Sequence, residues 1–292
     1  FESCKKLTDI GDSSGVSFVG YNALDDTPWY SSQEEVGGCK YVGNVLIECL
    51  DKKKTDIKLK EGTTMIGDLA FEGTKIYSLD FAKGIKIIGY RAFENCSNLS
   101  FAVIPDGVQH LGYDVFSSCK NLKEINLPES LEKIDRDAFN GCTSLGVIRI
   151  PENVKYIGES AFSGCTTLKE ISLPQSLKKI KEMTFSGCEN LNNIELPQNI
   201  TDIEMGAFMG CENLEVVKLP DTISHIEDYV FSGCKALREV VLSNNLKYID
   251  DATFNGCTSL SSIYLSDSVE GLGYNVFGEC TKLSEINIPD SI

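Results

Sequence analysis

The stretch LKEINLPESLEKIDRDAFNGC (residues 122–142) is followed directly by TSLGVIRIPENVKYIGESAFSGC (residues 143–165), and the two share one pattern. Each places aliphatic residues at the same intervals, then Ala-Phe, and closes with Gly-Cys. Outward from this stretch the closing cysteine recurs every 23 residues, at Cys96, Cys119, Cys142, Cys165, Cys188, Cys211, Cys234, Cys257 and Cys280. A fixed period of 20 to 50 residues is typical of proteins that stack one small unit many times. The sequence therefore predicts a tandem array.

The unit follows the pattern C-x2-L-x2-I-x-L-P-x2-L-x2-I-x3-A-F-x-G-C. Its I-x-L segment has the period of two that suits a short strand with one buried face. Proline then closes the strand, where a missing N–H matters least. The unit is too short to hold a full crossover helix. We therefore expect an α/β-type repeat solenoid with one short parallel strand per 23-residue repeat and an irregular, 3₁₀-like or weakly extended return side.

The phase of the pattern divides the chain. Residues 1–24 match it loosely, with Phe1, Cys4 and Leu7 in register, and we expect a partial N-terminal repeat there. Residues 25–50 interrupt the register as an insert, and residues 51–292 repeat continuously until the last unit stops halfway. We expect one elongated solenoid domain over residues 1–292. Because both ends cut through repeats and a solenoid needs capped ends, we expect a piece of a longer protein.

The insert has its own features. Tyr41 to Ile47 predict a β-hairpin around the two-residue turn Gly43-Asn44. A regular ladder would then place Cys39 opposite Glu48, so no disulfide to Cys49 is predicted. Two interpretations stay open for the segment that carries Trp29, the only tryptophan. The insert either covers one edge of the stack or forms a ligand platform around Trp29.

Charge and cysteine usage exclude several classes of function. The chain has 27 Lys and Arg against 43 Asp and Glu, a formal net charge of -16, which argues against nucleic acid and anionic membranes as partners. It has no uninterrupted apolar run of 18 residues, so no membrane insertion is implied. It also lacks a C-x2-C pair, so we expect no metal site. The repeating cysteines should instead form a buried column of free thiols, since Cys packs as a small hydrophobe.

A search for chemistry finds little. His110 and His225 are the only histidines, and they lie five repeats apart, about 24 Å at 4.8 Å per coil. No sequence motif for nucleotide binding, metalloprotease activity or a serine nucleophile is present. Acidic residues cluster after the second aliphatic column, and we interpret them as a solvated rim in preference to a calcium-binding edge. This acidic rim comprises Asp135, Asp137, Glu159, Glu182, Glu204, Glu227, Asp228, Asp250 and Asp251. We therefore expect no cofactor and no enzyme activity.

Side chains that flank the buried Ile of each strand should point to solvent, and these vary while the core repeats. Such variation is typical of a repeat scaffold that presents a binding surface. Exposed apolar clusters with polar rims often mark protein contacts, although scattered surface apolar residues are a second interpretation. The candidate ligand-contact residues are Phe101 and Val103 in one spot, Val216, Val241 and Tyr264 in another, and Trp29 in the insert.

The same unit resembles the BspA-like leucine-rich repeats, also called the Treponema pallidum type. Residues 122–142 and 168–188 match that motif almost without deviation, and the resemblance covers residues 51–292 continuously. It implies a right-handed leucine-rich-repeat superhelix in a bacterial cell-surface or secreted protein. Proteins of this type mediate adhesion or bind host matrix proteins such as fibronectin or fibrinogen. The expected partner is thus a protein, such as a host extracellular-matrix protein, or a glycan.

Three other roles stay open at this point. The chain could be a rigid spacer that displays another domain, a hydrolase that uses the acidic rim, or an intracellular scaffold of a protist. A spacer would bind nothing itself, and a hydrolase would need two carboxylates about 5 to 10 Å apart across a cleft. The identity of the ligand and the oligomeric state do not follow from the sequence.

Overall fold

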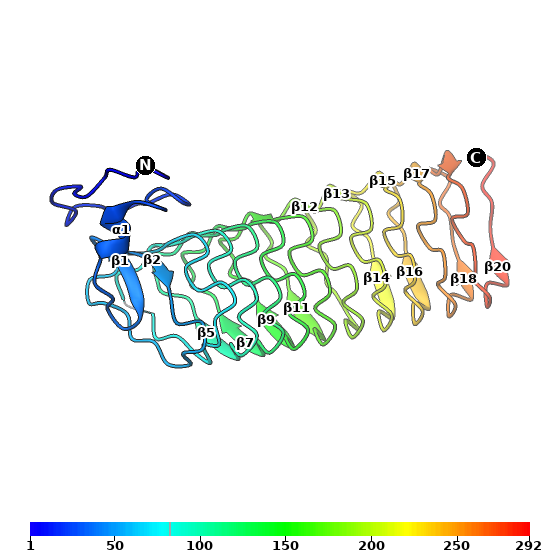
Figure 1. The fold of residues 1–292 in the computed structure, drawn as a ribbon. Coiled ribbons are helices and arrows are strands. Elements are labelled where there is room, and N and C mark those ends of the chain that lie inside the picture. The colour runs from blue at the N-terminus through cyan, green and yellow to red at the C-terminus, as the bar shows by residue number, and fades with distance from the viewer. Residues whose placement is uncertain (82) are drawn as a thin grey trace.

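The computed structural model, which describes residues 1–81 and 83–292, is one long stack of similar coils (Figure 1). Adjacent coils are offset by 23 residues, since Glu170 pairs in parallel with Val147 and Ile171 with Ile148. The repeat solenoid expected from the period is confirmed. The described part of the chain holds no helix with the length and hydropathy that a membrane crossing requires.

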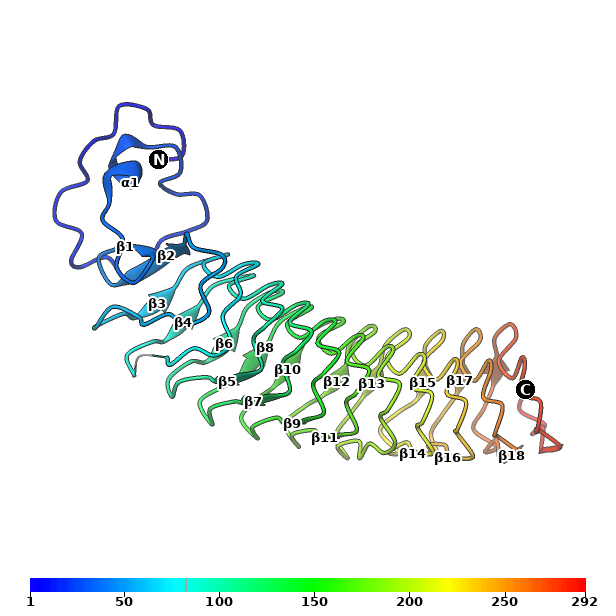
Figure 2. The same cartoon turned by 60° about the horizontal axis from the view of Figure 1, so that its bottom comes forward.

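The I-x-L segments form the expected strands, which line up along one edge of the stack as the first ladder (Figures 1 and 2). In β7 the middle residue Ile125 is buried and its neighbours Glu124 and Asn126 are exposed. Side chains alternate between the two faces of a strand, so one apolar position is enough to anchor each coil. The first ladder comprises β5 (Phe101–Val103), β7 (Glu124–Asn126), β9 (Val147–Arg149), β11 (Glu170–Ser172), β14 (Val216–Lys218), β16 (Glu239–Val241), β18 (Ser262–Ile263) and β20 (Glu285–Ile286).

The return side follows the weakly extended one of the predicted alternatives, because each coil contributes a second short strand there. The backbone N–H of Gly158 donates to the carbonyl of Ile134 in the preceding coil, and that of Asp250 donates to Ile226, both at 2.9 Å. The strands of this second ladder are β2 (Val45–Cys49), β3 (Met65–Ile66), β4 (Ile87–Ile88), β6 (His110–Leu111), β8 (Lys133–Ile134), β10 (Tyr156–Ile157), β12 (Lys179–Ile180), β13 (Asp202–Ile203), β15 (His225–Ile226), β17 (Tyr248–Ile249) and β19 (Gly271–Leu272).

A column of phenylalanine rings runs through the core between the two ladders. The rings stack nearly parallel from coil to coil, with centroids 5.1 Å apart at Phe71–Phe93 and 5.8 Å apart at Phe254–Phe277. Most of these rings are fully buried. The column explains why Phe recurs in every unit: each ring packs on its copy in the next coil, which supplies contacts that one coil alone lacks.

The predicted column of buried free thiols is confirmed beside the rings. Each thiol donates a hydrogen bond to a phenylalanine carbonyl of the preceding coil, as from Cys142 Sγ to the oxygen of Phe116 at 3.1 Å. Burial raises the pKa of the Cys142 thiol to about 12. Ser130 belongs to a second polar column, and its hydroxyl donates to the carbonyl of Val108 at 2.8 Å. Both columns use short side chains to satisfy backbone groups inside the stack.

The insert covers the N-terminal edge of the second ladder. The predicted hairpin is confirmed as β1 (Cys39–Val42) paired with β2, and β2 continues in parallel onto β3. A register shift between Lys40 and Tyr41 places Cys39 opposite Cys49. The expectation that Cys39 faces Glu48 was therefore wrong, because it assumed a ladder without a bulge. The short helix α1 (Pro28–Ser32) precedes the hairpin and is capped by the Thr27 hydroxyl.

Residues 1–24 differ from the partial repeat that their sequence phase predicts. They contain no strand, and Phe1 and Cys4 are exposed, outside the ring and thiol columns. Figure 2 shows this segment looping around α1 at one end of the stack. Its apolar residues, Leu7 among them, pack instead on a small separate cluster around Leu24, Trp29 and Val42. Residues 1–24 and the insert thus fold together.

Candidate binding face

The outward face of the first ladder carries a row of connected shallow hollows. Three neighbouring hollows of about 630, 610 and 460 Å³ share lining residues, so they form one trough over residues 123–218. Val147 and Arg149 line the first and second hollows, and Gln175 lines the second and third. Repetition causes this shape, because each coil presents a strand with a similar gap beside it. A long shallow trough suits a large partner better than an enclosed small molecule.

The trough is lined by residues of mixed charge. Glu124, Glu170 and Glu195 line it together with Arg149 and Lys218. The guanidinium of Arg149 lies 3.2 Å from the carboxylate of Glu129, and 76% of its side chain remains exposed. Exposed pairs of this kind add little to stability, so these side chains are free to take other partners. Acidic groups outnumber basic ones here, in keeping with the net charge of -16.

The first predicted apolar spot lies where the sequence places it. Phe101 and Val103 are the two outward residues of β5, with 39% and 46% of their surface exposed. They line a hollow of about 670 Å³ together with Phe81. Sequence reasoning missed Phe81, which occupies a core column yet packs only partly buried against the Phe93 ring at 5.7 Å. The sequence feature that could have identified Phe81 is an aromatic residue in a column that is otherwise Ile or Leu.

The second predicted spot is also on the outward face, although it is less compact. Val241 and Tyr264 occupy the same column in neighbouring coils and are 45% and 69% exposed. Val216 is half-buried and lies opposite Glu239, diagonal to Val241. The exposed Val147, at 60%, belongs to the same face between the two spots. The structure therefore brings five of the six candidate residues to one face and separates them into two groups.

Trp29, the sixth candidate, does not offer its ring to a ligand. It is 8% exposed and packs with Leu24 and Val42 in the small N-terminal cluster. The ring is buried because α1 lies over the hairpin and the chain from Leu7 closes on it, where the backbone N–H of Trp29 donates to the Leu7 carbonyl at 2.8 Å. This burial corrects the ligand-platform interpretation and agrees with an insert that covers an edge.

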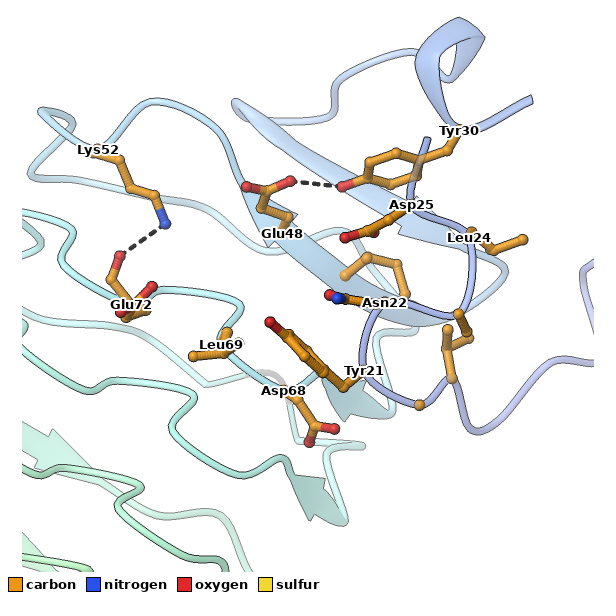
Figure 3. A pocket seen from close by; sticks show the side chains of 15 residues that line it. Tyr21, Asn22, Leu24, Asp25, Tyr30, Glu48, Lys52, Asp68, Leu69 and Glu72 are labelled. Atoms are coloured by element: carbon orange, nitrogen blue, oxygen red, sulfur yellow. Dashed lines mark hydrogen bonds between the residues drawn. The ribbon is translucent and has the colours of Figure 1, made fainter. Parts of the chain in front are cut away.

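Beside that cluster lies a polar cavity of about 210 Å³, shown in Figure 3. Tyr30 donates to Glu48 at 2.7 Å across it, and Lys52 donates to the Glu72 carbonyl at 2.7 Å. Burial, with the charge of Glu48 next in importance, raises the pKa of Asp25 above its usual range. The cavity is where residues 19–25 meet the first coils.

The acidic rim is occupied by structural contacts. Lys181 lies 2.6 Å from Glu204, and Asp228 accepts a hydrogen bond from the backbone N–H of Asp251 at 2.9 Å. His225 contacts Asp250 at 2.6 Å, far along the stack from His110. Within the residues that the structure describes, no group of three or more His, Cys, Asp or Glu is placed to hold a metal ion. These contacts fasten one coil to the next.

Comparisons with known proteins agree with this architecture. The sequence matches the family described as BspA type leucine rich repeat region, in six copies over residues 1–100, 86–215 and 178–292. A leucine rich cell surface protein from Faecalibacterium prausnitzii is 25% identical, with 88% of this chain and 86% of that chain covered and a TM-score of 0.52. No curated protein matches the chain.

Two further solved structures are similar. A leucine-rich repeat protein from Bacteroides ovatus is 29% identical, with 88% of this chain and 86% of that chain covered and a TM-score of 0.47. The pneumococcal vaccine antigen PcpA is 22% identical, with 82% of this chain and 63% of that chain covered and a TM-score of 0.57. The last likeness is one of fold.

Proposed function

Because the chain belongs to the BspA-type leucine-rich repeat family, we propose that it is a non-enzymatic binding protein of a bacterial cell surface. Its partner is a protein held against the outward face of the first ladder. The likeness to a cell surface protein of Faecalibacterium prausnitzii supports the location outside the cell. The pairing of rim carboxylates with lysines and backbone groups supports a role without catalysis.

The trough is the observation that carries this proposal. It is continuous from residue 123 to residue 218 and is lined by side chains that change from coil to coil, whereas the ring and thiol columns repeat. A core that repeats fixes the scaffold, and a face that varies can be shaped to one partner without loss of stability. Selection for binding a partner would then change the residues of this face and leave the core residues unchanged.

The size of the face favours a protein over a small ligand. Phe101 and Tyr264 stand about seven coils apart, which is about 34 Å at 4.8 Å per coil. A specific protein interface buries about 800 Å² on each partner and is commonly centred on aromatic anchors. The two apolar spots would be the anchors, and the charged trough between them would set orientation and the rate of encounter.

Binding to purified proteins tests the proposal. The purified chain is passed over immobilised extracellular matrix proteins, including fibronectin and fibrinogen, and in parallel over immobilised glycans. We expect at least one protein to bind. Tyr264→Ala should then weaken that binding at least tenfold, because truncating an anchor typically costs 2 kcal/mol or more, where 1.4 kcal/mol is tenfold.

Tyr274→Ala is the matched control, because Tyr274 is 81% exposed but follows β19 of the second ladder. The Tyr274→Ala variant should bind the partner with the same affinity as the unchanged chain. Binding to glycans alone would replace the proposed partner class. Protein binding that survives Tyr264→Ala, Phe101→Ala and Val147→Glu would remove the first ladder as the contact face. Binding to nothing would favour a rigid spacer.

A further inference from the structure

Two cysteines outside the repeating column face each other in the N-terminal hairpin. Cys39 lies in β1 and Cys49 in β2, and the bulge after Lys40 makes them direct cross-strand partners. Both are fully buried at the N-terminal end of the core. Neither belongs to the 23-residue period, so the packing that explains the other thiols does not explain this pair.

The backbone hydrogen bonds around the pair identify its geometry. The N–H of Leu50 donates to the Gly38 carbonyl at 3.0 Å, one residue outside the pair on both strands. Cys39 exchanges its own backbone bonds with Val36, and the N–H of Cys49 donates to Ala70. The two cysteines thus form a non-hydrogen-bonded antiparallel pair, whose Cα atoms stand about 4.5 Å apart. Disulfides require about 4.4 to 6.8 Å between these atoms.

The side chains also meet. The Cys49 thiol donates to the Gly38 carbonyl at 3.7 Å and lies near enough to Cys39 to lower the pKa of Cys39 below its usual value, ahead of the nearby charge of Lys54. Each thiol of the repeating column instead donates to a phenylalanine carbonyl, as Cys165 does to Phe139 at 3.2 Å. An inner member of that column has two equivalent neighbours, one above and one below. Cys39 and Cys49 have one cysteine partner each in the hairpin.

We propose that Cys39 and Cys49 form a disulfide that fastens the hairpin over the N-terminal end of the stack. The oxidant is a low-molecular-weight disulfide such as oxidised glutathione. The Cys39 thiolate attacks one sulfur of that disulfide, which forms a mixed disulfide and releases one reduced thiol. The Cys49 thiolate then attacks the Cys39 sulfur and releases the second, so the protein loses two electrons and two protons to one external disulfide. The bond forms while the hairpin folds, before burial closes the pair.

The bond would act at an open edge of the sheet. β1 is the outermost strand of its sheet and has a strand neighbour on one side only. If β1 opened, the buried Leu46 of β2 would lose the strand that covers it. A covalent link across β1 and β2 prevents that opening without changing the register that the bulge sets. This inference does not depend on which face binds a partner.

Peptide mapping provides the test. The chain is refolded with reduced and oxidised glutathione, denatured, alkylated with N-ethylmaleimide and cleaved with trypsin. Cleavage after Lys40 places Cys39 in residues 7–40 and Cys49 in residues 41–52. We expect these two peptides to remain joined until dithiothreitol is added, and ten of the twelve cysteines to be alkylated.

The controls separate this bond from its competitors. Cys96 and Cys119 also contact each other, but both lie in residues 92–120, so a bond between them would appear as a loop within one peptide. Cys39→Ser should leave all eleven remaining cysteines alkylated, whereas Cys4→Ser, at an exposed site, should keep the joined peptides. Dithiothreitol should also speed tryptic cleavage after Lys40 in the folded chain, and not in Cys39→Ser. Twelve alkylated cysteines, or the loop in residues 92–120 in place of the joined peptides, would overturn the proposal.

Discussion

The stacked phenylalanine column should make stability depend on position along the solenoid. Phe162 is fully buried between two rings, with centroids 5.3 Å from Phe139 and 5.7 Å from Phe185. Phe277 is partly buried and stacks on Phe254 alone at 5.8 Å. Phe162→Ala leaves a closed cavity and removes two stacked contacts, whereas Phe277→Ala opens onto solvent and removes one.

The magnitudes follow from burial. Replacing a buried Phe by Ala costs about 3 to 5 kcal/mol, and each stacked pair adds about 1 kcal/mol. We expect Phe162→Ala to lower the free energy of unfolding by about 5 kcal/mol. At Phe277 the loss should be about 2 kcal/mol, since the burial is incomplete and no closed cavity remains. Phe162→Leu, which keeps most of the volume, should fall between these values.

Urea denaturation followed by far-UV circular dichroism measures these losses. Equal slopes of free energy against urea would show that the variants unfold from the same state. Hydrogen exchange provides the second measurement, because a stack can lose cooperativity and unfold from one end. In the Phe277→Ala variant, the rate of amide hydrogen exchange should rise in the last coils only. Equal losses at both positions, or a loss below 1 kcal/mol at Phe162, would refute the view that neighbouring coils supply the stability.

Two further predictions concern titratable groups. Burial raises the pKa of the Cys142 thiol to about 12, so in the native chain at pH 8 a thiol reagent should modify the exposed Cys4 and leave Cys142 unmodified until urea is added. Burial also raises the pKa of Asp25 above 3.8. Between pH 3.8 and this raised pKa the folded chain holds a proton on Asp25 that the unfolded chain has released. The free energy of unfolding should therefore fall as pH rises from 3.8 through the folded pKa. Asp25→Asn should therefore slow proteolysis of residues 1–25 at pH 7, and a faster rate there would contradict the sign.

The period made most of the fold predictable. When Phe and Cys recur every 23 residues, stacking identical coils is the arrangement that brings Phe139 onto Phe162 and Cys142 onto Cys165. The outward positions of the first ladder follow from strand alternation, so Phe101 and Tyr264 were placed correctly by sequence alone. The second ladder was harder to predict, because a two-residue strand such as Tyr156–Ile157 is too short to show alternation.

The interrupted region could not be predicted to the same depth. One extra residue in β2, Ile47, lies opposite the step from Lys40 to Tyr41 and changes the partner of Cys39, and nothing in the strand pattern predicts a bulge of that size. The burial of Trp29 depends on the path of residues 7–24, which follow the repeat pattern in sequence but not in structure. Where a segment does not stack on another repeat, tertiary contacts override its local sequence pattern. The 23-residue period then does not predict its structure.

The same physics connects the fold to the proposed binding role. Each outward side chain of the first ladder is held by a buried neighbour in the same strand, as Val103 and Phe101 are by Ala102 between them. The anchors are therefore fixed before a partner arrives, and little conformational entropy is lost when it binds. The spacing between them is set by the number of coils and not by the residues of the trough. Substitutions in the trough can thus alter which partner fits while the ring column preserves the distance between the anchors.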